Sequence, residues 1–128
     1  LYDALYQIMG AESFVKNMEK GLIEVAPLAY MRGRTLDNAF IILDEAQNAT
    51  LNQLKMFLTR MGEHAKFIVT GDVTQIDLPD KSRSGLSKTV AMLEKTKGIT
   101  TINFNQKDIV RHRLVSTIIA AFEKEKNV

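Results

Sequence analysis

The feature that most constrains the fold of this chain is a short apolar run that stops at two adjacent acids. Residues 39–43 read Ala-Phe-Ile-Ile-Leu, and Asp44 and Glu45 follow directly. A run this short, with adjacent isoleucines and an abrupt acidic end, is typical of a buried strand in a parallel sheet. In open α/β sheets, ligands bind outside the carboxyl ends of the strands. The run therefore predicts an α/β fold with Asp44 and Glu45 at a ligand-binding edge.

The rest of the chain alternates between strand-like and helix-like segments. We predict strands at residues 22–26, 40–43, 66–70 and 99–104. We predict helices in residues 1–20 with a break at Gly10, from residue 51 to an end at Gly62, near residues 85–95, and from a cap at Asp108 onward. Thr50 and Gln53 have the spacing of a capping box before the second of these. The alternation predicts one domain over residues 1–128, a parallel sheet with right-handed crossovers and helices on both faces.

Composition excludes several classes of protein. The chain has no cysteine, which excludes disulfides and thiolate metal sites and agrees with a cytoplasmic setting. No apolar run approaches the roughly 20 residues that a membrane span needs. The formal charge of +2 is too small to indicate nucleic-acid binding by itself. However, residues 65–128 hold 11 basic and 7 acidic residues, so the second half is compatible with phosphate contacts.

The two acids suit nucleotide chemistry. Asp44 would hold Mg²⁺ through its water shell, and Glu45 would activate a water molecule. This is the Walker B pattern of nucleoside triphosphatases in its Asp-Glu form. The alternative is a solvent-facing strand end followed by an acid that starts a helix.

A second polar segment follows the next predicted strand along the chain. It reads Thr70-Gly71-Asp72-Val73-Thr74-Gln75, and its strand should lie beside the one that ends at Asp44. Gln75 could orient water or a phosphate through its amide. The alternative is a Gly-Asp turn capped by hydroxyl groups.

Arg111 is a third candidate. It is predicted in the first turn of the last helix, and helix starts lie at the carboxyl ends of parallel strands. An arginine there can stabilise the charge of a transferring phosphoryl group. Arg113 is two residues further on and would face the opposite side. The alternative for both is a solvated surface arginine.

Two predicted loops carry basic residues at the same edge of the sheet. Arg32 and Arg34 follow the first predicted strand, and Lys81 and Arg83 follow Pro79. Such side chains can bind a nucleic-acid backbone. The alternative is solvated loop charge, and no aromatic residues interleave with these cations to form a stacking platform.

One part of a nucleotide site is missing from the sequence. A phosphate-binding P-loop needs Gly-x-x-x-x-Gly-Lys-Ser/Thr, and none of the seven glycines is followed by lysine. We therefore expect the isolated chain to be inactive in nucleotide hydrolysis.

These motifs, in this order, resemble the signature of the PhoH-like protein family. The resemblance runs through essentially the whole chain. The matching segments are residues 21–36, 40–48, 55–60, 70–79, 84–86 and 108–112.

The resemblance implies an ATP-binding, RecA-like core of the P-loop type, similar to superfamily 1 helicase motors. It implies Mg²⁺-dependent ATP hydrolysis, a cytoplasmic setting, a link to RNA, and a homo-oligomeric ring such as a hexamer. Asp44 would be the Mg²⁺ acid, Glu45 the catalytic base, Gln75 the γ-phosphate sensor and Arg111 the arginine near the phosphates. Family members carry a Walker A loop upstream, so residues 1–128 are expected to be a domain that is incomplete at its N-terminus.

Two other functions stay open from the sequence. The basic loops could make the chain a non-catalytic module that binds nucleic acid or a protein. Alternatively, Asp44 and Asp72 could share metal ions in a phosphodiesterase, although Gln75 and Arg111 have no necessary part in that chemistry.

Overall fold

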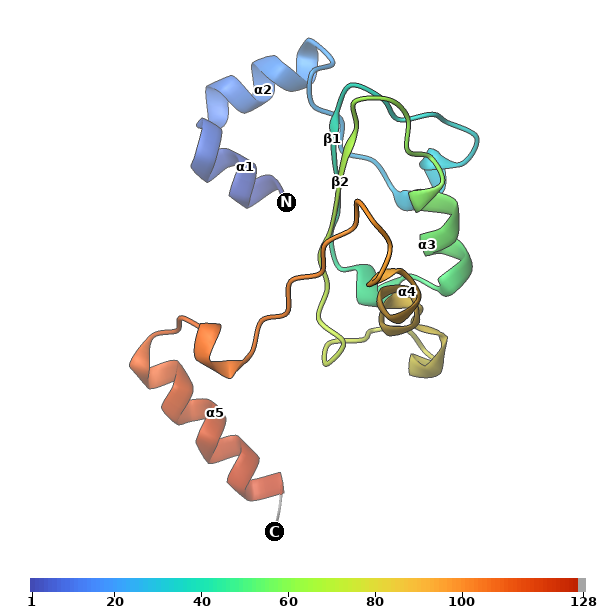
Figure 1. Cartoon of the computed structure of the whole chain (residues 1–128). Coiled ribbons are helices and arrows are strands. Elements are labelled where there is room, and N and C mark those ends of the chain that lie inside the picture. Colours follow the sequence, from blue (N-terminus) through green and yellow to red (C-terminus); the bar gives the residue numbers. More distant parts are fainter. Residues whose placement is uncertain (127–128) are drawn as a thin grey trace. The chain divides into compact units, whose positions relative to one another are not determined.

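The computed structural model describes residues 1–126 and divides the chain into two units, residues 1–97 and residues 98–128. Figure 1 shows the course of the chain. None of the helices in the described part is long and apolar enough to cross a membrane.

The first unit is built on two parallel strands, β1 (Phe40–Leu43) and β2 (Lys66–Val69). Their register pairs Phe40 with Lys66 and Leu43 with Val69. This confirms an α/β fold with a parallel sheet and both central strand predictions, to within one residue at the end of β2.

The two strands expose alternate side chains. Ile41, Leu43, Phe67 and Val69 are half-buried on one face, whereas Phe40, Ile42 and Ile68 are exposed on the other. In residues 1–97 the strands therefore bury one face, which differs from the two-sided burial that the apolar run suggested. A helical layer on the second face stays a prediction.

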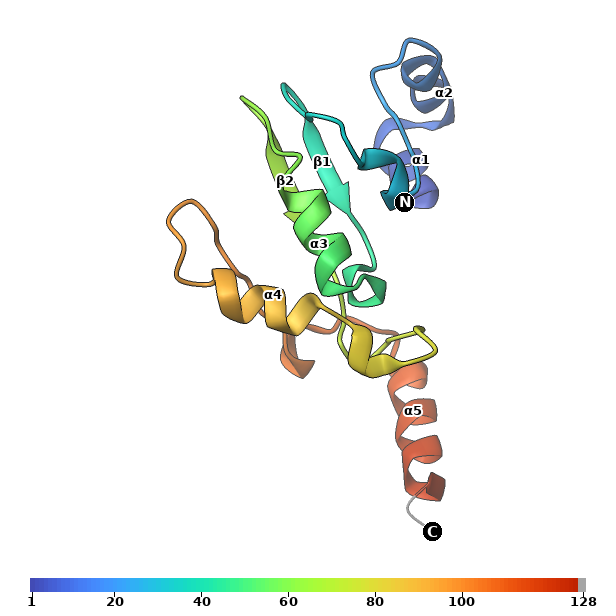
Figure 2. The same ribbon diagram turned by 90° about the vertical axis from the view of Figure 1, so that its right-hand side faces the viewer.

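Helix α3 (Leu51–Leu58) connects β1 to β2 and covers the buried face (Figure 2). Phe57 of α3 lies against Phe67 of β2, with ring centroids 5.0 Å apart. The helix begins at the predicted capping box. Thr50 Oγ1 accepts a hydrogen bond from the Gln53 backbone amide, and Gln53 Oε1 accepts one from the Thr50 backbone amide. It ends at Leu58 and not at Gly62, because the backbone amides of Arg60 and Met61 bond to carbonyls only three residues back and the chain turns.

The core lies where α3 meets helix α4 (Leu86–Leu93) and the ends of the strands. Gly85 is required at this junction, since a Cβ there would overlap the Leu51 backbone. The Gly85 amide also donates to the Ala49 carbonyl at 2.8 Å. The buried apolar residues of the cluster are Ala46, Ala49, Leu54 and Leu86.

Two short helices precede the sheet, α1 (Tyr2–Met9) and α2 (Ala11–Glu19). Gly10 separates them with φ of +79°, as its predicted role as a breaker requires. Phe14 of α2 is buried, and the rings of Tyr2 and Tyr6 pack edge-on against it.

Two predicted strands are absent from the described part of the chain. Residues 22–26 and 99–104 have no regular secondary structure. The amides of Leu22 and Ile23 bond to the Asn17 carbonyl at the end of α2, and Ile102 and Phe104 are exposed. Apolar alternation predicts an extended chain, but a strand also needs a neighbouring strand to bond with, and these segments have none among residues 1–126.

The second unit holds a short 3₁₀ helix, η4 (Gln106–Asp108), and helix α5 (Arg113–Lys126). The prediction that Asp108 caps the last helix was wrong. Asp108 closes η4 instead, where its carboxylate accepts from the Asn105 amide at 2.8 Å. The helix begins five residues later, and His112 Nδ1 accepts from the Leu114 amide at 3.1 Å.

Candidate functional site

The carboxyl ends of β1 and β2 bring the two predicted polar segments together. Leu43 and Val69 are paired, so Asp44 and Thr70 leave the sheet side by side. Thr70 donates its hydroxyl to Asp44 Oδ1 at 2.8 Å, and the Glu45 amide donates to the same oxygen at 3.0 Å. Asp44 is exposed, and both bonds use Oδ1. Its Oδ2 can therefore accept a hydrogen bond from a water molecule of a hydrated cation.

Glu45 occupies an unusual backbone conformation. Its φ of +55° lies in the left-handed region, which is costly for a residue with a side chain, on the order of 1–3 kcal/mol. The next residue anchors the turn, because the Ala46 amide donates to the Thr70 carbonyl at 2.9 Å. As a result, the backbone turns sharply straight after β1, and the Glu45 side chain is exposed beside the Thr70 segment.

The segment after β2 forms a turn organised by Asp72. Asp72 Oδ1 accepts from the hydroxyl and the amide of Thr74, and Oδ2 accepts from the Gln75 side chain at 3.0 Å. These bonds, the Thr74 hydroxyl first, hold the pKa of Asp72 below its ordinary value. Gln75 is exposed, and its amide nitrogen carries a second hydrogen, so it can meet a phosphate oxygen while bonded to Asp72.

Sequence reasoning missed a residue at this site, Gln47. It lies in the 3₁₀ helix η2 (Ala46–Asn48), and only 1% of its surface is exposed. Its side chain contacts Glu45, Asp72 and Gln75. An amide two residues after the acid pair was a signal in the sequence, but nothing in the sequence shows that it is buried.

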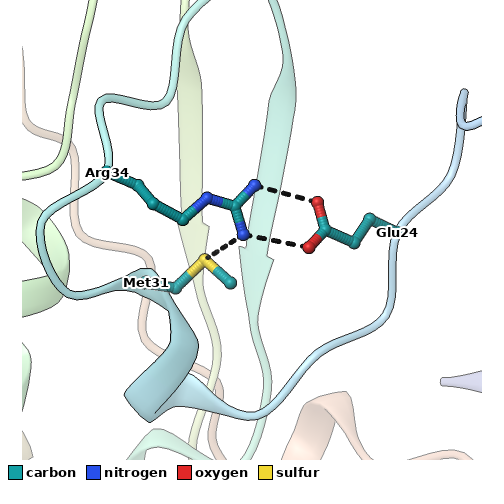
Figure 3. A network of polar contacts seen from close by, with 3 residues as sticks. All are labelled: Glu24, Met31 and Arg34. Carbon is teal, nitrogen blue, oxygen red and sulfur yellow. Dashed lines mark hydrogen bonds and ion pairs between the residues drawn. The ribbon is translucent and has the colours of Figure 1, made fainter.

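The arginines of the loop before β1 are placed differently. Arg32 is exposed. Arg34 forms a two-pronged ion pair with Glu24, both N–O distances being 2.9 Å, and its Nη1 lies 3.9 Å from the Met31 sulfur (Figure 3). This pair joins residues 22–26 to the loop, and the Arg34 guanidinium holds the pKa of Glu24 below its ordinary value. Arg34 thus has a structural partner that offsets its charge.

The second pair of cations lies in the 3₁₀ helix η3 (Lys81–Arg83), and both are exposed. Asp80 precedes them and accepts from the amide and hydroxyl of Ser82. The Ser82 hydroxyl is the main cause of a lowered pKa for Asp80, so this carboxylate stays ionised beside the two cations and weakens the local positive charge.

Arg111 lies in the second unit, in the irregular segment between η4 and α5. The structure therefore does not place it in the first turn of the helix, where it was predicted, because α5 begins at Arg113. Both arginines are exposed. The predicted contact of Arg111 with phosphates stays a prediction.

The donor set of the first unit suits one kind of metal site. Residues 1–126 hold no group of three or more acidic, histidine or cysteine side chains placed to bind a metal ion. Mg²⁺ usually keeps several waters and is held by one or two carboxylates together with substrate phosphates. A single exposed carboxylate, Asp44, beside the hydroxyl of Thr70 fits that requirement.

Comparisons with known proteins agree with one another. The family described as PhoH-like protein matches residues 1–123. The chain is 57% identical to the PhoH-like protein of Bacillus subtilis (strain 168) over 125 residues, which is 98% of this chain and 39% of that protein. It is 55% identical to the PhoH-like protein of Synechocystis sp. over 127 residues, 99% of this chain and 39% of that protein. Protein PhoH of Escherichia coli (strain K12) is 45% identical over 124 residues, 95% of this chain and 35% of that protein. The chain thus spans between a third and two fifths of the length of these relatives.

Proposed function

The chain belongs to the PhoH-like protein family, and from that premise we propose that it forms part of an ATP-hydrolysing domain that acts on RNA. The observation that carries the proposal is the pairing of two polar segments at one edge of the sheet. Asp44 and Glu45 directly follow β1, and the turn at residues 72–75 begins three residues after Val69, the last residue paired in β2. Hydrolysis of a nucleoside triphosphate needs an acid near the metal, a group that acts on the attacking water and a group that senses the phosphates.

Each of these groups has a candidate in the first unit. Asp44 would hold hydrated Mg²⁺, and the metal ion would neutralise negative charge on the phosphates of ATP. Glu45 would accept a proton from the attacking water. Its side chain is exposed at the same end of the strands as Asp44. Gln75 would bind a γ-phosphate oxygen through its amide, with its orientation fixed by Asp72. The proposal adds Arg111 of the second unit, which would supply positive charge near the phosphates as the family resemblance implies.

The phosphate cradle and the assembly are further parts of the proposal. Residues 1–128 contain no Gly-Lys-Ser/Thr loop, so other residues of the complete polypeptide would bind the phosphates. As a separate part of the proposal, several copies of the protein would form a ring. RNA would contact the exposed cations Arg32, Lys81 and Arg83. Arg34 is the weakest of the four predicted contacts, since Glu24 already binds it.

Steady-state phosphate release by the complete natural polypeptide that carries this chain tests the proposal. We expect hydrolysis of ATP that needs Mg²⁺, and Asp44→Asn should raise the Mg²⁺ concentration needed for half-maximal rate. Asp37→Asn is a matched control, because Asp37 is exposed and precedes the strand at its opposite end. Hydrolysis that is equally fast without divalent cations, or unaffected by Asp44→Asn, would remove Asp44 from the site.

A non-catalytic RNA-binding module is the second candidate, favoured by the exposure of the same three cations. It predicts salt-sensitive RNA binding by a polypeptide that neither binds nor hydrolyses ATP. Coupling of the two activities, with RNA raising the rate of hydrolysis, would argue against it.

A further inference from the structure

Gln47 has a combination of burial and bonding that core packing does not explain. It is 1% exposed and is the one buried polar or charged residue in the part of the chain that the structure describes. Burying an amide is unfavourable unless its hydrogen bonds are made, and an apolar residue of the same size would fill the space without that requirement. The partners of the amide therefore indicate its role.

All of those partners belong to the two polar segments. Gln47 Nε2 donates to the Glu45 carboxylate and to the Gln75 carbonyl, the latter at 3.3 Å. Gln47 Oε1 accepts from the Asp72 amide at 3.0 Å. One side chain thus joins the end of β1 to both ends of the turn after β2.

The surroundings leave room for this arrangement and for little else. A Cβ on residue 71 would lie 3.0 Å from Gln47 Oε1 and 2.6 Å from a methyl group of Leu86, so Gly71 permits the amide to reach the turn. On the other side, the Glu45 backbone is held in the left-handed region. Without the bond from Gln47, the exposed Glu45 side chain would be free to change rotamer.

We propose that Gln47 is a positioning residue, which fixes the Glu45 carboxylate and ties it to the turn at 72–75. The inference rests on the proposed function, in which Glu45 accepts the proton of the attacking water. A misplacement of about 1 Å can lower a rate roughly 100-fold, so the orientation of an exposed carboxylate matters. Because the same amide holds Asp72 and Gln75, the group that activates water and the group that senses phosphate keep a fixed spacing.

Two substitutions separate the bonds. Gln47→Met keeps the length of the side chain and removes all three hydrogen bonds. Gln47→Glu keeps an oxygen for the Asp72 backbone amide but, when ionised, has no hydrogen to donate to Glu45 or to the Gln75 backbone carbonyl. Thr89→Val is the matched control, because the Thr89 hydroxyl is buried in α4 and has no hydrogen-bond partner among residues 1–126.

The experiment measures kcat, KM and ADP affinity in the complete natural polypeptide, together with hydrogen–deuterium exchange of the peptide covering residues 71–77. Both Gln47 variants should lower kcat at least tenfold and change ADP affinity less than threefold. Exchange at residues 71–77 should rise most in Gln47→Met and less in Gln47→Glu, which keeps the bond from the Asp72 backbone amide. Thr89→Val should match wild type in every measurement.

Three other outcomes would each contradict the account in a different way. Thermal stability is measured beside these quantities; if it falls in both Gln47 variants together with kcat and ADP affinity while KM rises, the amide only supports the fold and the inference is overturned. If either variant keeps wild-type kcat while the wild type hydrolyses ATP, the inference fails and the proposed function stands. If the wild-type protein does not hydrolyse ATP, the proposed function itself fails, whatever the exchange data show.

Discussion

At the scale of single residues, three side-chain contacts connect separate segments of the chain: Thr70 with Asp44, Gln47 with Asp72, and Arg34 with Glu24. Asp44 and Thr70 lie side by side, as expected for the ends of neighbouring parallel strands. The sequence did not reveal that Gln47 joins Glu45 to the turn at residues 72–75, because burial depends on which segments fold over a residue. Nor did it reveal the partner of Arg34, since Glu24 is ten residues away and in a segment predicted as a strand.

The ion pair of Glu24 and Arg34 predicts a pH-dependent stability. The pKa of Glu24 is lowered from its ordinary value of 4.5, so the pair stabilises the folded protein above that pH. The contribution is lost as the pH falls below about 4.5 and through the lowered pKa of the folded state. Because both side chains are partly exposed, Glu24→Gln should cost less than about 1 kcal/mol at pH 7.

Urea unfolding of the wild type and of Glu24→Gln at pH 7 and at pH 3 measures this effect. The difference in unfolding free energy should shrink at pH 3, where Glu24 is protonated in more of the folded molecules. Glu63→Gln is the control, since Glu63 is exposed and forms no ion pair among the described residues. An equal difference at both pH values would mean that the pair does not act through its charge.

At the scale of elements, helices and strands with a clear sequence signal were predicted correctly, whereas strands without a neighbouring strand were not. The capping box fixes the start of α3, and the apolar runs fix β1 and β2. Residues 22–26 and 99–104 have strand-like composition but no strand to pair with in residues 1–126. The start of α5 was misplaced because Asp108 closes a separate 3₁₀ turn.

The capping box predicts a measurable loss of stability in Thr50→Ala. This substitution leaves the Gln53 amide without its acceptor at 3.2 Å, and a lost cap of this kind costs about 1 kcal/mol. Ser87→Ala is the control, because Ser87 is an exposed residue inside α4 and caps no helix. Urea unfolding should show the loss in Thr50→Ala alone; equal stability of the two variants would mean that the box does not stabilise α3.

At the scale of the whole molecule, the first unit leaves one face of its two strands exposed. The chain covers 35–39% of the relatives it matches. The exposed face of the strands carries Phe40, Ile42 and Ile68. An apolar sequence pattern shows that a strand is hydrophobic but not which segments cover it. For this reason a fully buried strand was predicted, although the first unit leaves one face of the strands exposed.

RNA binding by the complete polypeptide is a prediction at this scale. Lys81→Ala combined with Arg83→Ala should weaken RNA binding and make the dependence of affinity on salt shallower. In a plot of log affinity against log salt, the slope should change by about 0.7 for each lost phosphate contact to a single strand. Lys97→Ala combined with Lys95→Ala is the control at another exposed basic site. Unchanged affinity and slope in the first pair would exclude η3 from the RNA contact.

The role of Glu45 is the central claim, and single-turnover ATP hydrolysis by the complete natural polypeptide tests it most directly. Glu45→Gln should slow phosphate release about 100- to 10,000-fold, the range for loss of a general base, while ATP still binds. Glu63→Gln, an exposed acid outside the site, should hydrolyse ATP at the wild-type rate. A Glu45→Gln protein that hydrolyses ATP as fast as the wild type would contradict the account.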